Sequence, residues 1–195
     1  MPPRRRQPAG LTLLELLLVI AVMGILVGLV LPSSEPNTYD QLRSVTRIVT
    51  TDLAYGRSLA LANNSTYRFT FDTQQNRYVL EHSGGNAALD RLPDSPFRSA
   101  DDPPDRHIVD LDDLPHLATT VRLLTAAGFQ PGLQRVKDLE FGPLGETTRS
   151  GETLICLAAG SESETRYVWL CVNPVTGLAE VWWYTSQPPP PWLLN

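Results

Sequence analysis

The sequence predicts an α+β fold, in which a long N-terminal helix precedes and packs on antiparallel strands. An apolar run interrupted only by Thr12 and Glu15 covers residues 11–31. Apolar side chains then recur at intervals of three and four within residues 32–64, as on one face of a helix. From residue 66 onward, short alternating runs are separated by Gly, Pro and Asn, which is typical of strands and turns. Helix followed by strands predicts a helix packed on one or more antiparallel sheets.

Composition allows one packed domain with an attached segment and disfavours a nucleic-acid partner. The 195 residues are 42% hydrophobic and carry a formal net charge of -5. Three of the 16 basic residues are Arg4, Arg5 and Arg6, so the chain beyond them has 13 basic against 21 acidic residues, a net charge of -8. General nucleic-acid binding relies on Lys and Arg at phosphates, so nucleic acid is not an expected partner.

The apolar run is long enough to cross a bilayer. A helix over residues 11–31 would be about 31 Å long, close to the thickness of the hydrocarbon core. The preceding arginines predict a cytoplasmic N-terminus, which places the rest of the chain across the membrane. Pro32 and two serines follow the run instead of an A-x-A site, so an ordinary cleavable secretory signal is disfavoured.

Gly10, the following LTLLE and the apolar run resemble the type III signal of type IV pilins and type II secretion pseudopilins. The resemblance implies that residues 1–10 form a leader, that a prepilin peptidase cuts between Gly10 and Leu11, and that Leu11 is then N-methylated. The family usually has Phe at the first mature position, where this chain has Leu.

Glu15 would be the fifth mature residue, and it needs compensation inside a membrane. A charge in hydrocarbon costs on the order of 2.5 to 3.5 kcal/mol by insertion scales. The resemblance implies that the carboxylate pairs with the N-terminal amine of a neighbouring subunit and thereby selects staggered assembly. A tolerated charge near a helix end is the alternative. Gly24 and Gly28 have a spacing that could let helices approach closely, although chance explains it equally well.

After a break at residues 32–37, an amphipathic helix is expected from about Tyr39 or Asp40, with Asp40 as its cap, to Asn64. Its apolar stripe is predicted to pack on the sheet. Several polar residues lie mostly off that stripe: Arg43, Arg47, Asp52 and Arg57.

A hairpin is expected next, with strands at residues 66–72 and 77–81. The helix and the sequence YRFTFDTQQNRYVLE resemble the H-type minor pseudopilins and their FimT relatives. The later segments LEFGPLGE, TLICLAAG and RYVWLCVNPVTGLAEVW follow the order at the C-terminus of H-type pseudopilins. The resemblance thus covers most of the chain, with residues 65–187 as a periplasmic, β-rich domain.

Residues 83–115, rich in Gly, Pro and Asp, lie outside that resemblance. We expect a long irregular loop with a short strand at residues 107–111. Its aspartates suggest calcium, but the EF-hand spacing is absent and a solvated acidic loop is favoured over a metal site. The aspartates considered are Asp101, Asp102, Asp105, Asp110, Asp112 and Asp113.

Five further strands are expected in the C-terminal half, at residues 120–124, 139–141, 153–157, 167–172 and 179–184. Turns are expected at residues 127–128, 144–145, 150–151 and 176–177.

The cysteines are placed by the register of one hairpin. A turn centred on residues 162–164 would put Cys156 opposite Cys171, with both on the face away from the core and beside Trp169. A cross-strand disulfide then remains open, and a slip in the turn would remove it. The proline-rich tail, residues 188–195, is expected to strap over the domain's own surface, with a partner contact as the alternative.

No catalytic or cofactor motif is present, so neither an enzyme nor a bound cofactor is expected. His82, His107 and His116 lack metal spacing and are expected on the surface or in loops.

The function that the resemblance implies is a minor pseudopilin of a periplasmic pseudopilus in type II protein secretion. Its expected partners are the prepilin peptidase, other pilins or pseudopilins, the inner-membrane assembly platform and, before assembly, membrane lipid. Alternatives are a minor type IV pilus subunit for adhesion or DNA uptake, and a membrane-tethered binding domain that never polymerises.

Overall fold

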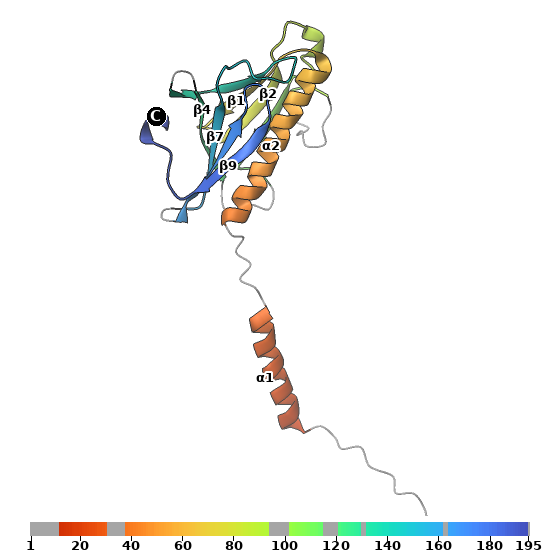
Figure 1. The fold of residues 1–195 in the computed structure, drawn as a ribbon. Helices are drawn as coiled ribbons and strands as arrows, with labels where there is room; N and C mark the ends of the chain where they lie inside the picture. The colour runs from red at the N-terminus through yellow and green to blue at the C-terminus, as the bar shows by residue number, and fades with distance from the viewer. Residues whose placement is uncertain are drawn as a thin grey trace, which may run out of the picture. The chain divides into compact units, whose positions relative to one another are not determined.

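The computed structural model describes residues 12–30, 38–93, 102–114, 121–129, 132–161 and 164–194, with side chains of the first helix described to residue 25 (Figure 1). The chain divides into two compact units, Met1–Glu35 and Pro36–Asn195. The first holds helix α1 (Leu13–Val30), and the second begins with helix α2 (Thr38–Asn63). Its other elements are β1 (Tyr67–Asp72), β2 (Arg77–His82), η1 (Ala87–Leu89), β3 (Arg106–Asp110), β4 (Val121–Phe129), β5 (Leu133–Val136), β6 (Asp138–Phe141), β7 (Thr153–Ala159), β8 (Arg166–Val172), β9 (Ala179–Thr185) and η3 (Pro191–Leu193).

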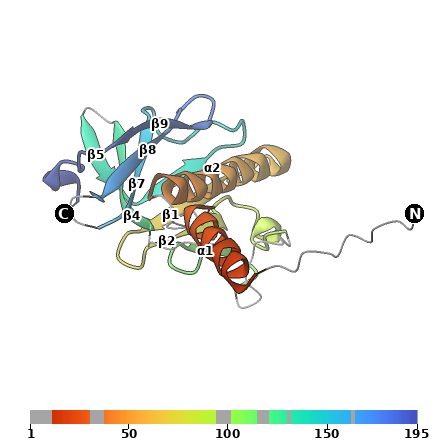
Figure 2. The same cartoon turned by 90° about the horizontal axis from the view of Figure 1, so that it is seen from below.

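The strands form two antiparallel sheets, ordered β3-β2-β1-β6 and β5-β4-β7-β8-β9. Figure 2 shows α2 lying along the strands of the domain, and it contacts strands of both sheets. The predicted fold class, a helix packed on antiparallel sheets, is therefore confirmed.

Helix α2 buries the predicted apolar stripe, with Leu42, Val45, Val49 and Leu53 all at most 2% exposed. It ends as predicted, before a residue in left-handed backbone, Asn64 at φ 47°. The predicted cap is wrong. The helix begins at Thr38, so Asp40 lies within its first turn. A carboxylate there is attracted by the positive end of the helix dipole.

The hairpin of β1 and β2 has the predicted strands and loop. Asp72 and Arg77 are its last paired residues, and the Asp72 carboxylate accepts hydrogen bonds from the backbone of Gln74 and Gln75. Strand β3 confirms the short strand expected in the acidic region, because it pairs with β2 in register from Arg106 to Asp110. Residues 94–101 and 115 of that region lie outside the described residues, as do residues 116–120 after it, which include His116.

The turn expected at Ala127 and Gly128 is wrong. Both residues lie inside β4, which pairs with β5 on one side and β7 on the other. A glycine at position 128 suits this strand, because an added Cβ would lie 3.3 Å from Val136 Cγ1, which is a tight contact. Close strand packing, rather than a turn, accounts for this glycine. Strand β5, which pairs with the residues that were expected to form the turn, was not predicted either.

The predicted cysteine pairing is also wrong, although the predicted faces are correct. Cys156 lies opposite Trp169, and Cys171 lies opposite Leu154. The register differs by two residues from the predicted one, which leaves every side chain on its predicted face. Both thiols are free. As diagonal neighbours, their Cα atoms lie beyond the usual reach of a disulfide.

The C-terminal tail lies over the domain's own surface, as predicted. Leu193 is fully buried among Ala127, Leu154 and Trp169 on the outer side of the five-stranded sheet. Its carbonyl accepts a 2.9 Å hydrogen bond from Thr125 Oγ1. The tail therefore closes a second, smaller core.

Candidate functional site

Helix α1 begins at a side-chain cap. The Glu15 backbone N–H lies 3.1 Å from the Thr12 carbonyl and 3.3 Å from Thr12 Oγ1. Thr12 to Glu15 follows the T-x-x-E spacing of a capping box, a pattern in the sequence that predicts a helix start at this point. Thr12, three residues before Glu15, therefore caps the helix, which begins at Leu13.

The described side chains of α1 are exposed on every side. Its large apolar residues are 46 to 77% exposed as far as Ile25. A helix that is apolar all round is typical of a membrane span or of the core of a large protein. Within the described part of its own unit, the Glu15 carboxylate has no hydrogen bond or ion pair, and a Cβ on Gly24 would have no atom within 4 Å. Gly10 and Leu11, the expected cleavage residues, lie outside the described residues, as do the surroundings of Gly28.

In the described part of the chain, no helix has both the length and the hydropathy of a membrane span.

In the second unit, the edge strand β9 exposes large side chains on both faces. A register shift between Trp169 and Leu170 leaves Trp182 without an opposite residue on β8. This bulge turns Val181 and Tyr184 toward α2, while Trp182 and Trp183 both lie on the outer face. All four are 39 to 47% exposed.

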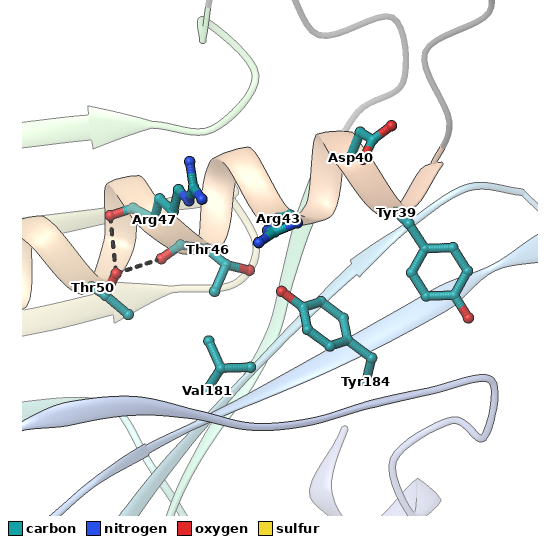
Figure 3. Close-up of a pocket in the computed structure, with 8 residues that line it drawn as sticks. All are labelled: Tyr39, Asp40, Arg43, Thr46, Arg47, Thr50, Val181 and Tyr184. Carbon is teal, nitrogen blue, oxygen red and sulfur yellow. Dashed lines mark hydrogen bonds between the residues drawn. The ribbon is translucent and has the colours of Figure 1, made fainter.

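A cleft of about 510 Å³ lies between the first half of α2 and β9 (Figure 3). It is lined by Tyr39, Asp40, Arg43, Thr46, Arg47, Thr50, Val181 and Tyr184.

The cleft carries two cations and one anion. Arg43 and Arg47 stand one helical turn apart on the exposed side of α2, and neither guanidinium has an ion-pair partner among the described residues. Tyr39 packs against Tyr184 with ring centroids 6.3 Å apart, and the Arg166 guanidinium lies 5.7 Å from the Tyr39 centroid. The cleft is therefore a basic surface with aromatic walls on an acidic domain.

A second hollow, of about 350 Å³, lies on the outer face of the same sheet beneath the tail. Trp182 and Trp183 contact each other there with centroids 4.1 Å apart. Pro188 to Pro190 and the buried Leu193 form its opposite wall. The chain's own tail thus forms one side of the hollow.

A polar cluster lies between α2 and the four-stranded sheet. The Tyr78 hydroxyl donates a hydrogen bond to Asp52 Oδ2. Burial raises the pKa of Asp52, against the opposing effects of Tyr78 and of nearby His107. Burial, then the Asp52 charge and hydrogen bond, raise the pKa of Tyr78 well above its usual value. Asp52 was expected off the packed face of the helix and instead lies partly within it.

The two described histidines are not the surface residues expected. His107 is 4% exposed, and the His82 side chain is fully buried. His82 Nε2 lies 2.7 Å from Ser65 Oγ, and its Nδ1 lies 2.7 Å from Asp90 Oδ1. The order Ser65, His82, Asp90 resembles that of a catalytic triad. The loop that contains Gly84 covers the Ser65 hydroxyl, however, because a Cβ on Gly84 would lie only 2.2 Å from Ser65 Oγ. The group joins the end of α2 to β2 and the following loop.

Burial raises the pKa of the Cys156 thiol to about 12. Burial, followed by Glu152 and Glu180, raises the pKa of Cys171 to about 11. Neither thiol is a reactive nucleophile at neutral pH. Within the described residues, no group of three or more His, Cys, Asp or Glu side chains could hold a metal ion.

Comparison with known proteins links the N-terminal helix to a described motif. Residues 5–31 match the prokaryotic N-terminal methylation motif. The chain is also 38% identical over 87 residues to type II secretion system protein H of Xanthomonas campestris. That match covers 44% of this chain, and the chain spans about half the length of this curated relative, 50%.

Among solved structures, the chain is similar to the type IV minor pilin FimU of Pseudomonas aeruginosa, with a TM-score of 0.44 and 16% identity over 78% of this chain and 95% of that one. A second crystal form of FimU gives a TM-score of 0.41 and 15% identity, over 76% of this chain and 97% of that chain. The resemblance predicted from the sequence is confirmed: the chain carries a prokaryotic N-terminal methylation motif and is similar, over part of its length, to type II secretion system protein H.

Proposed function

We propose that this protein is a minor pseudopilin, a structural subunit of a periplasmic pseudopilus in type II protein secretion. The observation that carries the proposal is the methylation motif at residues 5–31, which ends in an apolar helix with one carboxylate, Glu15. The partial similarity to type II secretion system protein H supports secretion as the process. A structural role, rather than catalysis, is part of the proposal.

Processing and topology follow from the same segment. A prepilin peptidase removes residues 1–10 by cutting between Gly10 and Leu11, and Leu11 becomes N-methylated. Before assembly, residues 11–31 anchor the chain in the inner membrane, with the arginine-bearing end cytoplasmic and the β-rich domain periplasmic. The exposed apolar surface of α1 supports this proposal, because water is a poor environment for it.

Assembly transfers α1 from lipid to the helices of other subunits. Glu15 then meets the N-terminal amine of a neighbour, and the pair is less costly in an apolar bundle than either charge alone. Gly24 has no side chain, so the backbone of a neighbouring helix can approach closely at this position. The assembly platform of the inner membrane is the proposed machinery for this step.

Replacing Glu15 tests the proposal. Glu15→Gln keeps the size of the side chain but removes its charge, so we expect normal cleavage after Gly10 and a loss of both filament incorporation and protein export. Glu164→Gln, at an exposed position of the domain, is the matched control and should leave both unchanged. Normal incorporation and export with Glu15→Gln would refute the role of this carboxylate.

A further inference from the structure

The cleft between α2 and β9 has a composition that the packing of the domain does not require. Arg43 and Arg47 are exposed, and the described chain offers neither an ion-pair partner. Tyr184 and Val181, which face them across the cleft, are 39% and 42% exposed. Figure 3 shows Arg43 and Arg47 on the helix, and Val181 and Tyr184 on the neighbouring strand.

We propose that this cleft docks an extended, carboxylate-bearing segment of a neighbouring pilin-type subunit. The inference rests on the function proposed above, because such a neighbour is present only in an assembly. Arg43 and Arg47 bind the carboxylate, and Val181 and Tyr184 pack against the apolar part of the segment.

The charges in the cleft favour a carboxylate over a polyanion. Asp40 lies in the same cleft as the two arginines, so the three groups sum to a single positive charge. That charge suits one carboxylate, which a guanidinium can bind through two parallel hydrogen bonds. A nucleic acid would bring several phosphates to an acidic domain with too few cations to neutralise them.

The strand beside the cleft favours an extended segment. β9 ends the five-stranded sheet, so its outer backbone groups have no partner strand within the described chain. An added strand can use such groups while its alternate side chains enter flanking pockets. The bulge at Trp182 interrupts the edge, so pairing is restricted to a short segment beside Val181.

Charge complementarity supports a subunit of the same general kind as the partner. After loss of its first ten residues this chain has a net charge of -8, with arginines unpaired in this cleft. Exposed carboxylates are therefore plentiful on such a subunit. Contact between unlike faces of successive subunits is also the type of interface that builds an open filament.

The test places a photoreactive benzoylphenylalanine at Tyr184 of the full-length protein in cells that carry its native assembly. Benzoylphenylalanine keeps an aromatic side chain at position 184, on the wall of the cleft. We expect cross-linking to an acidic segment of another pilin-type protein, located by mass spectrometry of the joined peptides. Cross-links to lipid, to DNA, or to a protein segment without carboxylates would overturn the proposal.

Charge reversal then tests the arginines. The double variant Arg43→Glu and Arg47→Glu should reduce that cross-link about tenfold, because attraction becomes repulsion. Arg43→Lys with Arg47→Lys should retain most of it. The matched control, Arg91→Glu with Arg122→Glu, makes the same change of charge at exposed positions outside this cleft and should leave the yield unchanged. An unchanged cross-link yield in the variant with Arg43→Glu and Arg47→Glu would overturn the proposal.

Two measurements in the same cells separate this inference from the proposed function. Cleavage after Gly10 and incorporation of the unmodified protein into filaments test the function alone. If both occur and the cross-link is absent, the docking proposal fails and the function stands. Resistance of each variant to limited proteolysis, compared with the unmodified chain, confirms that the domain remains folded.

Discussion

At the scale of single residues, Asp52 shows how a carboxylate is retained in a helix that packs on a sheet. Its Oδ2 accepts the hydrogen bond of Tyr78, and His107 lies close enough to favour the charge. Burial still outweighs both effects and raises the pKa of Asp52 above the usual value of 3.8. The folded domain therefore favours the protonated acid more than the unfolded chain does.

The raised pKa of Asp52 determines how the stability of the domain depends on pH. Because the folded pKa is raised, the contribution of Asp52 to the free energy of unfolding is most favourable below about pH 3.8 and is lost as the pH rises through the folded pKa. Asp52→Asn, which keeps an acceptor for Tyr78, should therefore be more stable than the unmodified protein at pH 7. Chemical unfolding from pH 3 to pH 8 checks this prediction.

The advantage of Asp52→Asn should shrink as the pH falls toward 3.8. Asp113→Asn, at an exposed position near the end of β3, is the control and should change little at either pH. A variant at position 52 that is less stable at neutral pH would show that the charged carboxylate, and not the neutral acid, is favoured in the fold.

At the scale of elements, the tail behaves as part of the domain. Its last turn, η3, places Leu193 against the outer face of the five-stranded sheet, where Trp169 and Leu154 bury it completely. The hydrogen bond from Thr125 then orients the backbone at the same position. Apolar burial and one directed contact thus order a segment with little regular structure.

Removing the buried side chain should destabilise the domain by about 2 to 5 kcal/mol, the usual cost of Leu→Ala in a core. Leu193→Ala provides that change, and Leu194→Ala is the matched control because Leu194 is 38% exposed. Urea unfolding of the full chain in detergent measures both. Equal stability of the two variants would mean that the tail is not bound to the sheet in solution.

Local patterns in the sequence predicted some elements well. The hairpin of β1 and β2 was predictable because alternating residues flank a polar loop, and α2 because its apolar stripe is regular. The second half of β4 was not, because Ala127 and Gly128 have the composition of a turn and their strand conformation depends on β5 and β7. Long-range pairing decided the structure there.

At the scale of the whole molecule, the sequence predicted the N-terminal motif that residues 5–31 match, but it did not predict the surface of the domain. Glu15 stands out because a carboxylate is costly in an apolar run and needs a compensating charge. Arg43 and Arg47 were predicted to lie off the apolar stripe, but nothing in the sequence placed them opposite β9. The bulge that turns Val181 and Tyr184 toward them depends on the register with β8, which the sequence does not encode locally.

The proposed function depends on one covalent event, the conversion of this chain into a mature subunit that begins at Leu11. The most direct measurement is the mass of the N-terminal peptide of the protein isolated from its native membrane. We predict a peptide that begins with N-methyl-leucine at residue 11. A mature chain that retains Met1 or its arginines would contradict the proposed function.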